Sequence, residues 1–253
     1  MTKPIVELQS IRVTYTSGHL WSRRVVDAVR DVTLTINEGE TVGLVGESGS
    51  GKTTLGRVAL GVIRPTFGQV RFGGEAFSGP RDRVRGQLSV VMQQPEWALN
   101  PRLRVGMSVA EPIDILGRVP GPERQKRIAA MLEMVGLDES FSFRFPHELS
   151  GGQRQRVAIA RALITDPRFV VFDEAVSALD VSVQTQVLNL IKNLQASRGF
   201  ASLFISHDLA ATRYVSNRIA VMYAGEIVEM AEATRFYAQP EHAYSRALFE
   251  TVM

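Results

Sequence analysis

The sequence predicts an α/β fold that carries an N-terminal antiparallel β segment and an inserted helical segment. Three observations predict it. Apolar and polar residues alternate over the first 40 residues, helical periodicity runs through residues 106–166, and apolar strands alternate with helices near residues 41–61 and after residue 169. Strands that alternate with helices are typical of βαβ units in a parallel sheet.

The N-terminal elements follow from short alternating runs. Residues 5–8, 11–15 and 32–36 predict half-exposed strands, and the segments that join them are too short for crossover helices, which favours antiparallel pairing. A turn at residues 37–40 leads into the apolar run 41–45, then into a glycine-rich loop and a helix from Thr53 to about Gly61. Residues 68–91 return to strand-like composition.

The second half alternates between helix and strand. Residues 128–135 form a helical run closed by Gly136, residues 169–172 predict a buried strand, and residues 202–205 predict another. Between these two strands, residues 181–194 predict an amphipathic helix. Its apolar face consists of Val187, Leu188, Ile191 and Leu194.

These elements predict a single domain over residues 1–253, because the sequence shows no internal repeat and no long linker. We expect the following division: residues 1–40 and 68–91 as antiparallel β structure and core, 41–67 and 168–225 as the phosphate-binding core, 94–166 as the helical subdomain, and 226–253 as a C-terminal segment.

Composition narrows the class of protein. The 253 residues carry a net charge of only +3, which does not argue for nucleic-acid binding, and they contain no cysteine, which excludes disulfides and thiolate chemistry. Apolar runs are much shorter than the roughly 20 residues that a membrane-spanning helix needs. The N-terminus lacks the pattern of a secretory signal, so we expect a cytoplasmic location.

A glycine-rich loop carries the strongest chemical signal. It fits the pattern G-x-x-x-x-G-K-[ST] between a predicted strand and a predicted helix, and its residues are Gly46, Glu47, Ser48, Gly49, Ser50, Gly51, Lys52 and Thr53. Glycines allow backbone N–H groups to turn inward around phosphates, and the following helix points its positive end at the same anion. Lys52 is expected to reach the β- and γ-phosphates and Thr53 to bind Mg²⁺, so the sequence predicts a P-loop NTPase fold. The alternative interpretation of residues 46–53 is an ordinary glycine turn.

Two carboxylates follow a buried strand. Asp173 and Glu174 come directly after the apolar residues 169–172, and the carboxyl ends of parallel strands are where such folds bind ligands. We expect Asp173 to serve the Mg²⁺ shell and Glu174 to act on the water that attacks the γ-phosphate. Taken alone, the pair could equally be a helix cap at a strand-to-helix turn.

The string Leu149-Ser150-Gly151-Gly152-Gln153 precedes a periodic helical run and predicts a second phosphate site. Ser150 is placed as the N-cap, and the glycines leave the first backbone N–H groups open to an anion. Lys52 and Ser150 both lie at helix N-termini far apart in sequence, which favours two chains that face each other head to tail over one chain that brings both to one phosphate.

These residues resemble the ATP-binding subunits of ABC transporters, whose signature is the Leu-Ser-Gly-Gly-Gln string. The other family motifs follow in order: Tyr15, Gln93, the run 177–180 and His207. Each alone has a plainer interpretation, namely an exposed strand aromatic, a turn beside Pro95, and a strand-end histidine for Tyr15, Gln93 and His207. The resemblance covers nearly the whole chain and implies an ABC ATPase core.

The resemblance implies a role for each matching residue. Catalysis is assigned to Lys52, Gln93, Glu174 and His207, and Mg²⁺ binding to Thr53, Gln93 and Asp173. The nucleotide would be contacted by Tyr15, Gly46, Glu47, Ser48, Gly49, Ser50, Gly51, Lys52, Thr53, Thr54 and Asp180. The residues Ser150, Gly151, Gly152 and Gln153 would complete the site of the partner ATPase.

Several strings are similar to the peptide and nickel importer ATPases. They are the long stretch 16–30, the loop string 43–52, and residues 99–102, 178–184 and 242–248. The stretch 16–30 and residues 99–102 resemble the second ATPase of a pair. Gln94, Ala175 and Thr53 stand where the family commonly has Asp, Pro and Ser. The chain stops at Met253 without the cysteine-containing extension of many peptide members, which favours the shorter nickel or metal-chelate type.

The resemblance implies an importer subunit that hydrolyses ATP with Mg²⁺ at the cytoplasmic face of the inner membrane. Its expected partners are two transmembrane permease subunits, a second related ATPase or a copy of itself, and indirectly a solute-binding protein, with no nucleic acid. Permease contact is expected near residues 94–116. The alternatives are an exporter or lipoprotein-release ATPase, and a soluble ABC ATPase outside transport.

Overall fold

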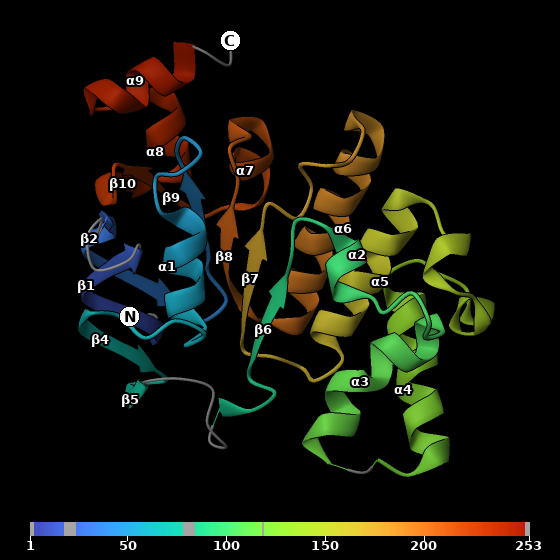
Figure 1. The fold of residues 1–253 in the computed structure, drawn as a ribbon. Helices are drawn as coiled ribbons and strands as arrows, with labels where there is room; N and C mark the ends of the chain where they lie inside the picture. The colour runs from blue at the N-terminus through green and yellow to red at the C-terminus, as the bar shows by residue number, and fades with distance from the viewer. Residues whose placement is uncertain (1–2, 18–23, 78–83, 118, 251–253) are drawn as a thin grey trace. The chain divides into compact units, whose positions relative to one another are not determined.

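The computed structural model describes residues 3–17, 24–77, 84–117 and 119–250 (Figure 1). The chain divides into two compact units. The first comprises Met1–Arg81 and Ala201–Met253, and the second comprises Asp82–Phe200.

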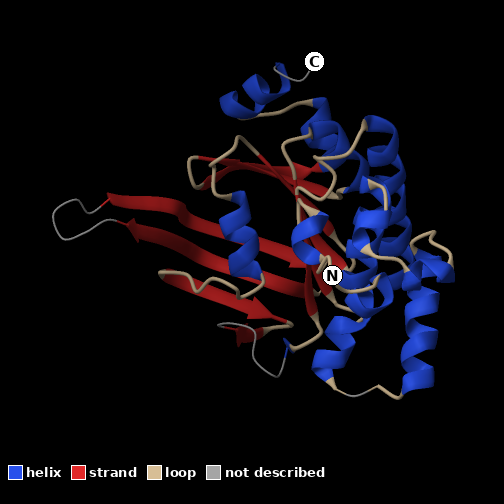
Figure 2. Ribbon diagram, turned by 45° about the vertical axis from the view of Figure 1, so that its right-hand side comes forward, coloured by secondary structure: helices blue, strands red, loops and turns tan. Residues whose placement is uncertain are grey.

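The first unit contains an antiparallel sheet in the order β2-β1-β4-β5. Its strands are β1 (Pro4–Ser17), β2 (Arg24–Asn37), β4 (Phe67–Phe72) and β5 (Glu75–Phe77). Figure 2 shows the long paired strands β1 and β2. The expected antiparallel pairing of the N-terminal strands is therefore present.

The strands β1 and β2 are longer than the sequence pattern predicts. The runs 5–8 and 11–15 are one strand, and part of the stretch 16–30 is the start of β2. The physical reason is a set of register shifts, one between Leu8 and Ile11, near which Ser10 adopts a left-handed backbone with φ of 50°. A β-bulge inserts an extra residue and breaks the two-residue alternation on which the prediction depends.

The first unit also holds a second group of strands, in the order β10-β9-β3-β8. β3 (Thr41–Val45) pairs in parallel with β8 (Ala201–Ile205) and β9 (Arg218–Tyr223), and β10 (Glu226–Glu232) pairs antiparallel with β9. Its helices are α1 (Lys52–Ala59), α7 (Leu209–Val215), α8 (Ala233–Ala238) and α9 (Ala243–Glu250). The residues of β3 and β8 are all buried, as expected for parallel strands.

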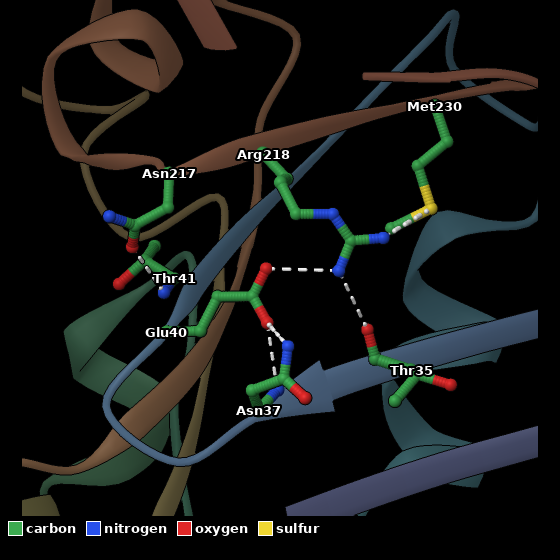
Figure 3. A network of polar contacts seen from close by, with 7 residues as sticks. All are labelled: Thr35, Asn37, Glu40, Thr41, Asn217, Arg218 and Met230. Carbon is green, nitrogen blue, oxygen red and sulfur yellow. Dashed lines mark hydrogen bonds and ion pairs between the residues drawn. The ribbon is translucent and has the colours of Figure 1, made fainter. Parts of the chain in front are cut away.

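A polar network fixes the turn that leads into β3 (Figure 3). Glu40 accepts hydrogen bonds from the N–H and the side-chain amide of Asn37, both at 2.8 Å, and pairs with Arg218 of β9 at 3.0 Å. Arg218 also donates to the Thr35 carbonyl. Because both carboxylate oxygens of this nearly buried side chain are satisfied, the desolvation cost of the charge is offset, and the start of β3 is held to β2 and β9.

The second unit consists of two parallel strands and a group of helices. β6 (Leu88–Val91) pairs with β7 (Phe169–Asp173), and Val91 lies opposite Phe172. The helices are α2 (Pro95–Ala98), α3 (Val105–Leu116), α4 (Gly121–Met134), the 3₁₀ turns η2 (Glu139–Phe143) and η3 (Pro146–Glu148), α5 (Gly151–Leu163) and α6 (Val181–Arg198). The four apolar residues predicted on one face of α6 are its buried ones.

Candidate functional site: a phosphate loop and a carboxylate cluster

At two positions of the loop between β3 and α1, the backbone conformation and the close packing admit only glycine. Gly46 has φ of 148°, and a Cβ there would lie 2.1 Å from the Met222 carbonyl oxygen. Gly51 has φ of 107°, and its Cβ would lie 2.2 Å from the Ala28 carbonyl oxygen. The glycines of the motif are therefore required by close backbone packing as well as by conformation.

The amine of Lys52 lies inside this loop. The residue is only 5% exposed, and Nζ donates to the carbonyl oxygens of Gly46 and Glu47 at 2.7 Å each. Helix α1 starts at the same residue, and its N-cap, Gly51, supplies no side-chain hydrogen bond. An anion that approaches the loop therefore meets a positive helix end and a buried ammonium group, as a phosphate site requires.

Tyr15 and His207 belong to the same unit as the loop. Tyr15 lies in β1 opposite Val26 and is 42% exposed, so its ring is accessible for stacking. His207 is exposed and lies between β8 and α7, where Asp208 caps α7 by accepting from the Ala211 N–H at 3.0 Å. The assignment of these two side chains to the nucleotide stays a prediction.

Gln93 and Glu174 are joined by a hydrogen bond in the second unit. Nε2 of Gln93 donates to Oε2 of Glu174 at 2.9 Å. The pairing of β6 with β7 explains the contact: Val91 is opposite Phe172, and both side chains lie two residues beyond that pair, at the carboxyl ends of parallel strands. The bond orients the carboxylate that is proposed to act on water.

Backbone strain occurs at Glu174 itself. Its φ is 51°, a left-handed conformation that is uncommon for a residue other than glycine. Ser177 stabilises the turn, because both its N–H and its hydroxyl donate to the Glu174 carbonyl, at 3.2 and 3.0 Å. Gln93 also reaches the Ser177 hydroxyl at 3.4 Å. Strain at a carboxylate so closely held is typical of functional positions.

The signature string begins α5 with a capping box. The Ser150 hydroxyl accepts from the Gln153 N–H at 3.3 Å, and the Gln153 side chain accepts from the Ser150 N–H at 3.0 Å. The N-cap prediction for Ser150 is confirmed. A Cβ on Gly152 would lie 2.5 Å from the Val183 side chain, so this glycine is needed for close packing of α5 on α6.

Asp180 caps α6 within its own chain. Its carboxylate accepts from the Val183 N–H at 3.0 Å and from the Ser182 hydroxyl at 2.8 Å. These hydrogen bonds to the ionised form, the Val183 N–H foremost, lower the pKa of Asp180. The cap is a structural role in the single chain, and the assignment of Asp180 to the nucleotide stays a prediction.

The donors assigned to Mg²⁺ are all oxygen groups. Thr53 offers a hydroxyl, Gln93 an amide oxygen and Asp173 a carboxylate at the end of β7. Among the described residues, no cluster of three or more His, Cys, Asp or Glu side chains could hold a metal ion. A hard cation with few protein ligands completes its shell with substrate phosphates and water, so these donors fit Mg²⁺ that arrives with a nucleotide.

The structure thus brings the phosphate loop together in one unit and Gln93, Glu174 and Ser177 together in the other. Sequence reasoning placed Ser177 in a family motif without a role. It also gave no role to Tyr244, whose hydroxyl accepts from the Glu47 N–H of the phosphate loop at 3.0 Å. The similarity of residues 242–248 to importer ATPases was the available signal for Tyr244.

Comparisons with known proteins agree with this set of motifs. The family model described as ABC transporter matches residues 29–177. A putative peptide import ATP-binding protein of Brucella abortus (strain 2308) is 51% identical over 236 residues, which cover 91% of this chain and 70% of the relative. The oligopeptide transport ATP-binding protein OppF of Bacillus subtilis (strain 168) is 43% identical over 259 residues, with 100% and 83% covered.

A solved structure gives the same result for the fold. The ATP-binding cassette MJ0796, in a dimeric post-hydrolysis state bound to ADP and Pi, superposes with a TM-score of 0.80 at 32% identity, over 90% of this chain and 99% of that one. The predicted P-loop NTPase fold of the ABC ATPase type is therefore confirmed.

The chain belongs to the ABC transporter family. It is an ATPase, the ATP-binding and ATP-hydrolysing subunit of an ABC importer. As an importer ATPase it works with membrane permeases and dimerises. No helix in the described part of the chain is long and apolar enough to cross a membrane.

Proposed function

We propose that this chain hydrolyses MgATP to drive the uptake of peptides, as one of two ATPases bound to the cytoplasmic face of two permease subunits. The observation that carries the hydrolytic part is the hydrogen bond from Gln93 to Glu174 at the carboxyl ends of β6 and β7. The cargo class is supported by the relatives, which are named as peptide and oligopeptide import proteins. Uptake of nickel or metal chelates is the alternative cargo.

The phosphate loop supplies the binding chemistry. The Lys52 ammonium and the N-terminal end of α1 neutralise the phosphates, and the remaining contacts are assigned to the loop and its surroundings. Tyr15 stacks on the adenine, and Thr54 follows Thr53 in the first turn of α1. His207 contacts the γ-phosphate. Mg²⁺ bound through Thr53, Asp173 and Gln93 would neutralise charge on the β- and γ-phosphates.

The carboxylate cluster supplies the hydrolytic chemistry. Glu174 accepts a proton from the attacking water, or orients it, while Gln93 fixes the position of its carboxylate. Ser150, Gly151, Gly152 and Gln153 contact the nucleotide held by the other ATPase, and Asp180 is assigned to nucleotide binding. Hydrolysis therefore requires a head-to-tail dimer, formed with a related ATPase or with a second copy of this chain.

Permease docking is assigned to α3. Met107, Ile115 and Leu116 of this helix are 49%, 61% and 41% exposed. Apolar side chains on an exposed helix are a source of binding free energy when another protein covers them. The predicted contact region, residues 94–116, includes this helix.

Co-purification tests the assembly. Tagged full-length chain is isolated from detergent-solubilised membranes, and its partners are identified by mass spectrometry. Two permease subunits and a second ATPase are expected. Ile115→Asp should lose the permeases, whereas Val62→Asp, at an apolar residue of similar exposure, 64%, should retain them. A soluble or nucleic-acid partner in place of permeases would overturn the transport assignment. The cargo is then decided by reconstituting the complex in vesicles and comparing the accumulation of peptide with that of nickel.

A further inference from the structure

The C-terminal segment contacts the phosphate loop, and neither the predicted catalytic residues nor the family motifs account for that contact. Helix α9 carries residues 243–248 of the string that resembles importer ATPases, and both helices α8 and α9 belong to the same unit as the loop. Figure 1 shows α8 and α9 next to each other.

Glu229 of β10 anchors the start of this segment. Its two carboxylate oxygens accept hydrogen bonds from the N–H groups of Glu241 and His242, both at 2.9 Å. Burial alone would raise the pKa of Glu229, but these backbone hydrogen bonds, together with the Ser245 side chain and the nearby His242, lower the pKa, so the carboxylate is ionised at neutral pH. Phe249 packs on Phe236, with ring centroids 5.4 Å apart, at the other end of α9. The helix is therefore fixed at both ends.

Tyr244 is the second residue of α9, and its hydroxyl reaches the phosphate loop. Its ring packs against Tyr223, the last residue of β9, with centroids 4.3 Å apart. Its hydroxyl oxygen accepts from the Glu47 N–H at 3.0 Å. Burial raises the pKa of Tyr244, so the hydroxyl stays neutral at physiological pH.

The turn after Tyr223 contacts the phosphate loop at a second point, Ser50. Gly225, which has φ of 90°, donates its N–H to the Ser50 carbonyl at 3.0 Å. Glu47 and Ser50 are thus both held by groups that adjoin the Tyr223–Tyr244 pair. The Glu47 carbonyl in turn accepts from the Lys52 amine. A shift of Glu47 would displace an anchor of the ammonium group that meets the phosphates.

We propose that Tyr244 is a positioning residue for nucleotide binding: its hydroxyl, carried by α9 and supported by Tyr223, fixes Glu47 and thereby the Lys52 amine. The inference rests on the proposed role of the loop in binding ATP. Tyr244 touches no nucleotide in this scheme and acts only through the loop.

The test compares Tyr244→Phe with Tyr237→Phe in the full-length chain. Both substitutions remove one hydroxyl from the same aromatic cluster. Tyr237→Phe is the control, because the Tyr237 hydroxyl donates to the Leu209 carbonyl at 2.6 Å and not to the phosphate loop. Tyr244→Phe should raise the dissociation constant for a fluorescent ATP analogue by about three- to tenfold, the usual effect of one lost hydrogen bond, with kcat at saturating ATP changed less. Tyr237→Phe should leave the dissociation constant unchanged.

Amide hydrogen exchange shows whether Tyr244→Phe acts locally on the phosphate loop rather than through a general loss of stability. The Glu47 N–H should exchange faster in Tyr244→Phe and at the wild-type rate in Tyr237→Phe, with equal melting temperatures for the two variants. Wild-type nucleotide affinity in Tyr244→Phe would overturn the inference, whether or not the Glu47 N–H exchanges faster. Failure of the wild type to bind the analogue would instead overturn the proposed function of the loop.

Discussion

The phosphate loop and the carboxylate cluster are held in place by different means. The loop is fixed by backbone contacts, with glycines packed against the carbonyl oxygens of Met222 and Ala28 and the Lys52 amine enclosed by loop carbonyls. The cluster is fixed by side chains, because Gln93, Glu174 and Ser177 contact one another near the surface. Backbone packing gives a rigid binding site, whereas side-chain hydrogen bonds can re-form around a reacting water.

The largest effect should come from Glu174→Gln, which separates hydrolysis from binding. Glutamine keeps an oxygen that accepts from Gln93 Nε2 but cannot take a proton from water. We expect kcat to fall by about 10²- to 10⁴-fold, the usual contribution of a general base, with nucleotide affinity unchanged. Single-turnover hydrolysis and equilibrium binding check this. Wild-type hydrolysis in the variant would show that the base is another group, and Glu148→Gln, a carboxylate on η3, serves as the control.

Sequence alone predicted the loop well, because its chemistry is local. A strand, a glycine pattern and a helix follow one another within residues 41–59, and the backbone that they form is the one expected. The buried face of α6 was predicted for the same reason, since helical periodicity is a local property. Both features depend on neighbours in the chain rather than on distant partners.

Other features were not predicted from the sequence, because they depend on contacts between segments that are distant in the chain. The bulges of β1 and β2 shift the register and conceal a strand in the stretch 16–30. The contact of Tyr244 with Glu47 joins residues almost 200 positions apart, and no spacing rule predicts it. Gln93 and Glu174 were each predicted as site residues, but their hydrogen bond follows only from the register of β6 with β7.

An intermediate effect should come from Gly51→Ala, compared with Gly49→Ala. Both glycines have positive φ, 107° and 82°, but a Cβ on Gly51 would meet the Ala28 carbonyl at 2.2 Å, whereas a Cβ on Gly49 meets nothing within 4 Å. We expect Gly51→Ala to lower the free energy of unfolding of the nucleotide-free chain by about 2–4 kcal/mol and Gly49→Ala by about 1 kcal/mol, the cost of the strained backbone alone. Denaturant unfolding measures both. Equal losses would mean that the loop is not rigid at Gly51.

The smallest effect should come from Gln93→Ala, which tests how the carboxylate cluster is held. The substitution removes the donor that orients Glu174 at 2.9 Å, and a hydrogen bond to a charged group contributes about 1.5–3 kcal/mol, so kcat should fall at least about tenfold. Because the group is exposed, the melting temperature should stay within 1–2 °C of the wild type, roughly the shift expected for an exposed side chain. Gln94→Ala, at the adjacent exposed amide, should change neither quantity. A large loss of melting temperature in Gln93→Ala would show that this cluster, like the loop, is part of the structural framework, and the distinction between the two regions would then fail.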